Sequence, residues 1–222
     1  MTTQFKSFVS CIAGQIESHL PGEDAHLEFS PIGRKKSSLY LEYVNPKISA
    51  VTLLLFELNE EPHFLLIQRQ EYNGNHSGEI CFPGGKKDEQ DENIFATAKR
   101  ECEEETGIPS QFLINLGNLT DVYIPVSNHL VHPFVCYLKG NPTPFLQPDE
   151  REVKNVIICP VKRLFESDVK STISKTWSNG KTTNDIPCFI IQGKVVWGAT
   201  AIILNEFRWM VRNHFQRFYS DL

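Results

Sequence analysis

The stretch that decides the fold reads Phe82-Pro83-Gly84-Gly85-Lys86-Lys87-Asp88 and resumes as Arg100-Glu101-Cys102-Glu103-Glu104-Glu105-Thr106-Gly107-Ile108. Its Pro and its paired Gly predict a turn in which the backbone approaches a ligand closely. The residues that follow favour a helix, and Gly107 is of the type that commonly ends one. The sequence therefore predicts a glycine-rich turn that leads into an acidic helix.

Three acidic residues of this helix, Glu101, Glu104 and Glu105, follow one another at i, i+3 and i+4. Their Cβ atoms are then about 5–6 Å apart on one exposed face, where like charges repel. Mg²⁺ takes oxygen ligands of this kind, so the pattern favours a metal site. Glu103 points to solvent. The alternative is a solvated acidic helix, as most charge runs are. The stripe that we expect to pack inward is Phe95, Ala98 and Cys102.

The stretch resembles the signature of the Nudix hydrolases, G-x5-E-x7-R-E-U-x-E-E-x-G-U, in which U is aliphatic. The matching residues are Arg100, Glu101, Glu104, Glu105, Gly107 and Ile108. Cys102 takes the first aliphatic place, and Asp91 is the acid nearest to the early Glu position. Gly85 lies one residue further from Arg100 than the general pattern has it. This longer spacing, preceded by Phe-Pro-Gly-Gly, is similar to the coenzyme A diphosphatase (CoA pyrophosphatase) branch.

A second motif upstream resembles the same branch. It runs from Leu65 through Arg69 to His76-Ser77-Gly78. Gly74 stands where the branch usually has a second Arg. Arg69 either grips a phosphate bidentately or pairs with a carboxylate, and we weigh these evenly. His76 lies in a glycine-containing loop, where a His more often contacts a ligand than fills a core.

The resemblance implies roles for individual residues. The metal ligands would be Glu101, Glu104 and Glu105, with the Gly84 carbonyl completing the shell. One of these glutamates or Glu152 would help to deprotonate the attacking water, and the catalytic set is Glu101, Glu104, Arg100 and Glu152. Arg100 would orient a glutamate, since it precedes Glu104 by one helical turn. Glu152 as a plain solvated loop acid is equally open. The substrate contacts would be Arg69, His76, Gly85 and Ser127, the last in a Pro-Val-Ser loop.

The implied fold is the α/β Nudix fold, a mixed β-sheet sandwiched between α-helices (an α/β/α sandwich). We expect a single domain over residues 1–222 with an N-terminal helical extension at about 1–45. Apolar spacing predicts helices at Phe5–Leu20 and after Trp197, and a short one at Pro160–Leu164. The predicted strands are Leu39–Val44, Ile48–Leu58, Phe64–Gln68, Phe112–Leu119, Val131–Leu138, Val153–Cys159, Val169–Trp177 and Cys188–Ile191.

Composition bounds the class of protein. The chain has 222 residues, 41% hydrophobic and 22% charged, with a net charge of −5, which is typical of a globular protein. The negative charge disfavours general attraction to nucleic acid or to an anionic membrane. Six scattered cysteines without a C-x-x-C pair predict reduced thiols. No apolar run is long enough for a membrane span, so we expect a cytoplasmic protein. A homodimer stays open.

The implied reaction is metal-dependent hydrolysis of a diphosphate, with Mg²⁺ or Mn²⁺ neutralising its charge. For coenzyme A or a derivative, the products would be 4′-phosphopantetheine and adenosine 3′,5′-bisphosphate. The alternative enzyme is a Nudix hydrolase of another nucleoside diphosphate derivative, such as ADP-ribose, a nucleotide sugar or a dinucleoside polyphosphate. A third reading is a non-catalytic Nudix-fold ligand sensor, which degenerate carboxylates would favour.

Overall fold

The computed structural model describes the chain except residues 32–35, 38–44, 73–75, 178–179 and 219–222, and of residues 213–218 it describes the backbone alone. The helices are α1 (Thr3–Ser18), α2 (Gly22–Glu28), α4 (Ile94–Thr106) and α5 (Gly198–Phe218), with 3-10 turns η1 (Ser110–Phe112), η2 (Thr143–Phe145) and η3 (Val161–Phe165). The strands are β1 (Lys47–Leu58), β2 (Glu61–Arg69), β3 (Ile80–Cys81), β4 (Gly84–Lys86), β5 (Leu113–Asn118), β6 (Val122–Ile124), β7 (His129–Leu138), β8 (Val153–Pro160), β9 (Lys170–Thr176), β10 (Thr182–Ile191) and β11 (Lys194–Trp197).

The central sheet is mixed. β1 runs parallel to β7, and every other pair in this sheet is antiparallel. β1 and β2 form a hairpin only between Leu55–Leu58 and Glu61–Phe64. Where the two strands part, β3 pairs with β2 and β4 pairs with β1. The prediction of a turn at Gly84 and Gly85 is therefore wrong: the split leaves the start of β1 free to pair, and these residues form strand β4 inside the sheet.

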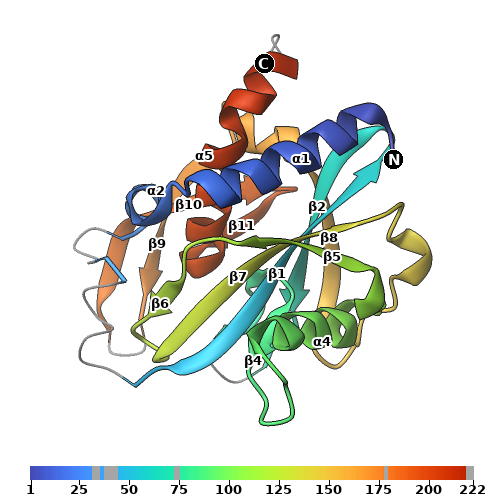
Figure 1. Ribbon diagram of the computed structural model, residues 1–222. Coiled ribbons are helices and arrows are strands. Elements are labelled where there is room, and N and C mark those ends of the chain that lie inside the picture. Colours follow the sequence, from blue (N-terminus) through green and yellow to red (C-terminus); the bar gives the residue numbers. More distant parts are fainter. Residues whose placement is uncertain (32–35, 38–44, 73–75, 178–179, 219–222) are drawn as a thin grey trace.

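The two faces of the sheet bury different partners (Figure 1). Leu53 and Leu55 of β1 belong to a large core with residues of α1 and α5, whereas Ala50 and Leu54 pack with Ala98 and Cys102 of α4. Successive side chains of a strand point to opposite faces, so these two sets lie on opposite sides of β1. The expected mixed sheet between helices is therefore confirmed.

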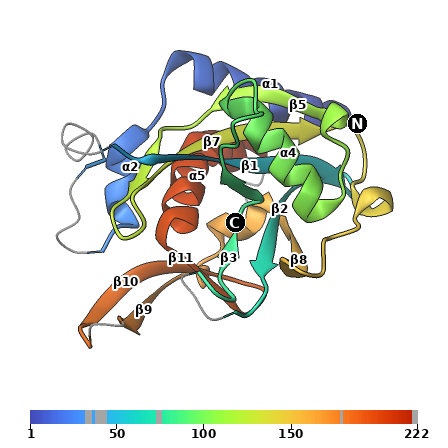
Figure 2. The same ribbon diagram turned by 90° about the horizontal axis from the view of Figure 1, so that it is seen from below.

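A second, three-stranded sheet has the order β11-β10-β9. Figure 2 shows the long β9–β10 hairpin extending beside β11 and β3. Phe189 and Val196 of this sheet join the same core as α1 and α5. Lys194 Nζ donates to Gln68 Oε1 over 2.9 Å. The second sheet is thereby fastened to the edge of the central sheet that carries β2 and β3.

Most of the predicted elements are confirmed with ends shifted by a few residues. The sequence analysis did not predict α2, which begins at Gly22 directly after Pro21. It also did not predict β11, whose four residues are too few for a clear alternation. The predicted strand Leu39–Val44 and Gly74 lie outside the described residues.

Candidate active site

The geometry of β4 requires its two glycines. A Cβ on Gly84 would lie 2.3 Å from the carbonyl oxygen of Ala50. A Cβ on Gly85 would lie 2.4 Å from the carboxylate of Glu101. The predicted close approach of backbone is therefore present, and one of the groups that approaches is a glutamate of α4. Thr52 N–H donates to the Pro83 carbonyl over 2.8 Å, which holds the residue before β4 against β1.

Helix α4 is fixed at both ends and in the middle. The Asn93 side chain accepts a hydrogen bond from Ala96 N–H and caps the first turn. Gly107 ends the helix in the left-handed conformation with φ 78°. The Thr52 hydroxyl of β1 donates to the Ala98 carbonyl over 3.0 Å. These contacts set the rotation of α4 that turns Glu101 and Glu105 toward β4.

Glu105 is buried, with 2% of its surface exposed. Its Oε2 accepts from Gly84 N–H at 2.8 Å, and its Oε1 lies 3.5 Å from Arg69 Nη1. Burial raises the pKa of Glu105 to about 7; repulsion from Glu101 and Glu152 adds to the rise, and Gly84 and Arg69 oppose it. The expectation of one exposed acidic face is wrong at this position, because the split sheet covers that side of α4.

Glu101 lies beside Gly85 and is half-buried. Burial raises the pKa of its carboxyl group, and the neighbouring charges of Glu104 and Glu152 raise it too, against the effect of Arg100. Glu152 lies just before β8, where its carbonyl accepts from Gln70 N–H at 2.8 Å. The fold therefore brings the charge of Glu152 within electrostatic range of both Glu101 and Glu105.

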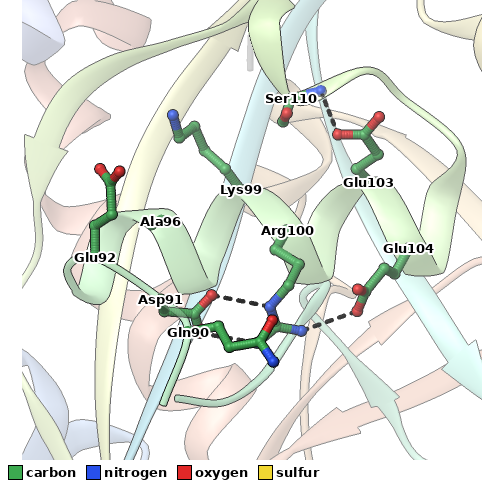
Figure 3. A pocket seen from close by; sticks show the side chains of 9 residues that line it. All are labelled: Gln90, Asp91, Glu92, Ala96, Lys99, Arg100, Glu103, Glu104 and Ser110. Atoms are coloured by element: carbon green, nitrogen blue, oxygen red, sulfur yellow. Dashed lines mark hydrogen bonds and ion pairs between the residues drawn. The ribbon is translucent and has the colours of Figure 1, made fainter. Parts of the chain in front are cut away.

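Arg100 binds three carboxylates, and Figure 3 shows two of them, those of Asp91 and Glu104. Its Nη1 lies 2.9 Å from Glu101 Oε1 and 2.9 Å from Glu104 Oε2. Its Nε and Nη2 donate to the two oxygens of Asp91, each over 3.0 Å. Hydrogen bonds from Arg100 hold the pKa of Asp91 well below its ordinary value. Arg100 thus contacts two glutamates of α4, and its spacing predicted the contact with Glu104.

Asp91 is a residue whose role sequence reasoning missed. It is 8% exposed, and its Oδ2 also accepts from Asp88 N–H and the Thr97 hydroxyl. Asp91 therefore joins the loop after β4 to the first turn of α4 and anchors Arg100. In the sequence, Asp91 precedes Thr97 by six residues and Arg100 by nine. No helix or strand periodicity marks these two spacings, so Asp91 cannot be distinguished from a solvated loop acid by sequence alone.

A cavity of about 360 Å³ lies on the outer side of α4. Its lining residues are Gln90, Asp91, Glu92, Ala96, Lys99, Arg100, Glu103, Glu104 and Ser110. In Figure 3, Glu103 turns toward Ser110, whose N–H it accepts at 3.1 Å, and Glu104 turns toward Arg100. Glu101 and Glu105 do not line this cavity. Glu104 is thus the one member of the predicted acidic trio that faces this side.

Arg69 ends β2 next to Glu105, so the ion-pair alternative is present in the structure. Its Nε atom is buried and has no hydrogen-bond partner among the described residues. Burial raises the pKa of the adjacent Cys81 thiol to about 12. Because a thiolate is the nucleophilic form, Cys81 is unsuited to nucleophilic catalysis, as the sequence indicated.

The remaining predicted substrate contacts lie around the same end of the sheet. His76 is exposed, has φ 66°, and lies with Nδ1 2.8 Å from Glu79 Oε2. Glu79 in turn lies 3.0 Å from Lys175 Nζ of β9. Ser127 lies in the turn between β6 and β7, and its N–H donates to the Ile124 carbonyl. The fold brings both loops to the end of the sheet from which β4 emerges.

The donor set fits a hard divalent cation. Within the described ranges, no three acidic, His or Cys side chains already surround one point. Glu101 and Glu105 nevertheless present oxygen atoms, the ligand type that Mg²⁺ and Mn²⁺ prefer, beside backbone that glycine leaves open. Burial and repulsion from neighbouring carboxylates raise the pKa of both carboxyl groups, and a cation there would relieve that repulsion.

Comparison with known proteins assigns the family. The NUDIX domain family matches residues 46–177, more than half of the chain. This chain belongs to the Nudix hydrolase family. A Nudix hydrolase named NudL, itself described as uncharacterized, from Yersinia enterocolitica is 29% identical over 163 residues, 71% of this chain and 78% of that protein. NudL from Yersinia pestis is 29% identical over 168 residues, 71% of this chain and 76% of that protein.

Solved Nudix structures also resemble the chain. A MutT/nudix family protein from Enterococcus faecalis covers 82% of this chain and 70% of its own, at 17% identity and a TM-score of 0.48. An Ap4A hydrolase from Caenorhabditis elegans covers 54% and 83%, at 22% identity and a TM-score of 0.44.

As a Nudix hydrolase, the protein is a pyrophosphohydrolase of a small molecule that contains a diphosphate. Nudix hydrolases generally use divalent metal cations, and the donor set described above agrees with that use. None of the helices in the described ranges combines the length and the apolar character that a membrane crossing needs.

Proposed function

We propose that this Nudix hydrolase cleaves coenzyme A or a derivative to 4′-phosphopantetheine and adenosine 3′,5′-bisphosphate. The observation that carries the hydrolytic part is the buried Glu105 beside Glu101, held against the open backbone of Gly84 and Gly85. The substrate part is supported by the Phe-Pro-Gly-Gly stretch and by the upstream motif that ends in His76-Ser77-Gly78.

We assign the metal to Glu101, Glu104 and Glu105, with the Gly84 carbonyl as a further ligand. Bound Mg²⁺ or Mn²⁺ would neutralise the diphosphate and lower the pKa of an attacking water. Arg100 holds Glu101 and Glu104 in place from one side. Glu104 is exposed and faces the outer side of α4. To bind the same metal ion as Glu101 and Glu105, its side chain has to rotate away from that side.

The general base is Glu152 or one of the glutamates of α4. Glu152 is exposed and lies within electrostatic range of Glu101 and Glu105, which suits a group that takes a proton at the edge of the site. The Arg69 side chain is partly exposed beside Glu105, which supports a contact of its guanidinium group with a phosphate oxygen while the ion pair is kept. His76, Gly85 and Ser127 complete the substrate contacts in this proposal.

The wider assignments are proposals of the same kind. We propose one Nudix domain over residues 1–222 with an N-terminal helical extension at about 1–45, supported by the shared core of α1 with β1 and α5. The net charge of −5 supports a small-molecule substrate rather than nucleic acid or an anionic membrane. We propose a cytoplasmic location and leave a homodimer open.

The test is direct. The purified protein is incubated with Mg²⁺ or Mn²⁺ and coenzyme A, ADP-ribose or diadenosine polyphosphates in parallel, and the products are identified by mass. Release of 4′-phosphopantetheine with the highest kcat/KM supports the proposal. Turnover of the other compounds alone overturns coenzyme A as the substrate. It favours a Nudix hydrolase of another nucleoside diphosphate derivative, in line with Gly74 at the position where the coenzyme A branch usually has a second Arg.

A matched pair of variants controls for a contaminating hydrolase in this experiment. Glu101→Gln removes a carboxylate beside Gly85, whereas Glu103→Gln makes the same change on the solvent side of α4. Activity that survives in both variants shows a contaminating hydrolase. Absence of turnover in the wild type with every compound favours the ligand sensor.

A further inference from the structure

Two lysines and a histidine gather where three strands begin or end at one corner of the central sheet. Lys47 opens β1 and lies beside His129, the first residue of β7, in parallel register. Lys86 ends β4 and lies opposite Ser49 on the other side of β1. The Ser49 Oγ atom is 2.7 Å from His129 Nδ1. Register and this hydrogen bond thus collect Lys47, Lys86 and His129 around Ser49.

These side chains share the sheet face opposite α4. In β1, Leu53 belongs to the core with α5, and Ala50 belongs to the core with α4. Since successive side chains alternate, Ser49 lies on the α5 side with Leu53. Lys86, directly opposite Ser49, shares that side, whereas the preceding Gly85 faces α4. The end of β4 therefore presents the acidic site on one face and a lysine on the other.

The turn before β7, which contains Ser127 and Asn128, is hydrogen-bonded to the same corner. Lys47 N–H donates to the Asn128 carbonyl over 2.8 Å. The Asn128 side chain donates to the Asn45 carbonyl over 3.1 Å and accepts from the Tyr123 hydroxyl at 3.0 Å. Ser127 precedes Asn128. The loop that we assign to the substrate thus forms the rim of the cationic corner.

The two lysines of this corner form no ion pair within the described residues, although Asp88 and Glu89 line the same hollow as Lys86. His129 Nε2 has no hydrogen-bond partner among the described residues. The lysines that ion pairs neutralise elsewhere are Lys36, Lys154, Lys162, Lys170 and Lys175. Burial lowers the pKa of His129, and repulsion from Lys47, His76 and Lys86 lowers it further. The corner is thus a local positive site on a protein of net charge −5.

We propose that Lys47, Lys86 and His129 form a subsite for a phosphate monoester that the substrate carries in addition to its diphosphate. The proposal rests on the proposed function, because it takes the side of β4 that faces Glu101 as the place of hydrolysis. A phosphate monoester carries about −1.5 to −2 charges at pH 7, which lysines bind as point charges.

The spacing suits a nucleotide that carries both groups on one ribose. Gly85 and Lys86 are consecutive, so their Cα atoms are about 3.8 Å apart. With a 5′-diphosphate held beside Gly85, the proposal requires the Lys86 side chain to meet the 3′-position of the same ring around the end of β4. The substrate would then pass around the end of β4, with the ribose between the two sites.

Binding tests the subsite without turnover. Adenosine 3′,5′-bisphosphate and AMP differ in the 3′-phosphate alone, and their affinities are measured by calorimetry at fixed ionic strength, since salt screens exposed charges. We expect the wild type to bind the bisphosphate about tenfold more tightly, and Lys47→Met and Lys86→Met each to remove most of this preference. The matched control is Lys139→Met, an exposed lysine after the opposite end of β7, which should keep it.

Three outcomes overturn the proposal: equal wild-type affinities, a preference that both variants retain, or an equal loss in Lys139→Met, which would indicate general charge attraction. Activity gives a second readout. The ratio of kcat/KM for coenzyme A to that for dephospho-coenzyme A should fall in Lys47→Met and Lys86→Met through KM, with kcat kept. If neither compound is hydrolysed, the proposed function fails, and the binding comparison still decides the subsite.

Discussion

At the scale of single residues, Gly84 and Gly85 are neighbours that exclude a side chain for different reasons. A Cβ on Gly84 would meet backbone at 2.3 Å, at φ 156°, where β1 cannot yield. A Cβ on Gly85 would meet the Glu101 carboxylate at 2.4 Å, and that side chain can rotate away. Gly84 is therefore required for the pairing of β4 with β1, and Gly85 is required for the position of the Glu101 carboxylate.

Substituting each glycine by Ala separates the two roles. Gly84→Ala should lower the free energy of unfolding by about 2–3 kcal/mol, since both its conformation and its contact resist a side chain. Gly85→Ala should change stability by less than about 1 kcal/mol but lower kcat at least about tenfold, because Glu101 is displaced. Urea unfolding and steady-state kinetics check the pair. Equal stability losses would contradict the distinction.

Glu105 tests the buried half of the acidic site. Glu105→Gln keeps the size of the side chain and an oxygen for Gly84 N–H but removes the charge, so we expect a loss of kcat of about 100-fold or more with the fold retained. Glu103→Gln, on the exposed side of α4, should stay within about threefold of the wild type. Circular dichroism and kinetics measure both. A Glu105→Gln enzyme of normal kcat would remove this residue from the proposed metal site.

At the scale of elements, α4 works as a unit whose ends are set locally and whose orientation is set by β1. Asn93 caps its start, Gly107 ends it, and the Thr52 hydroxyl holds its middle. Asp91 and Arg100 then lock the preceding loop to the helix. The catalytic geometry therefore depends on contacts that lie outside the reacting groups.

Removing the cap tests how far helix stability and site geometry are coupled. Asn93→Ala should lower the free energy of unfolding by about 1 kcal/mol, because the Ala96 N–H loses its acceptor. Arg100 stays bound to Asp91 in this variant, so kcat should remain near that of the wild type. Urea denaturation and kinetics at low temperature give the two numbers. A large loss of kcat at full folding would mean that the cap also orients the glutamates.

At the scale of the whole molecule, Glu28 joins three elements. Its carboxylate on α2 accepts from Asn205 and Trp209 of α5 and pairs with Lys170 of β9. Burial raises the pKa of Glu28, but the hydrogen bonds from Lys170, Asn205 and Trp209 outweigh it and lower the pKa to about 2. The second sheet and both helices thus share one ionised group.

This lowered pKa predicts that the contribution of Glu28 to the free energy of unfolding is lost at acid pH. Because the pKa in the folded protein lies below the unfolded value of 4.5, the stabilisation is complete above that pH and disappears as the pH falls toward 2. The carboxylate is 36% exposed, so we expect only about 1 kcal/mol after solvent screening. Glu28→Gln should be less stable than the wild type at pH 6, and the difference should shrink below pH 4.5 and vanish only as the pH falls toward 2. The control Glu17→Gln is exposed and should track the wild type at every pH in this range.

The sequence by itself determined the features that short-range chemistry encodes. The acidic helix and its end at Gly107 follow from helix propensity and backbone freedom, and the structure confirms both. The close approach of backbone at Gly84 and Gly85 is confirmed too, but these residues form strand β4 and not the predicted turn. The contact between Arg100 and Glu104 follows from their spacing and is present in the structure, and the role of Arg100 in orienting glutamates stays a prediction. Family membership followed from the same stretch.

Only the tertiary structure decided which groups meet across the chain. Glu105 is buried because β1 and β2 part and admit β4, a long-range pairing that leaves no mark in the helix itself. Glu206 is equally hidden in its sequence: it is fully buried in α5 and accepts from His26, Gly22 and Thr120. Periodicity tells which face of an element is apolar, whereas the partner of a buried charge depends on how distant segments are packed together.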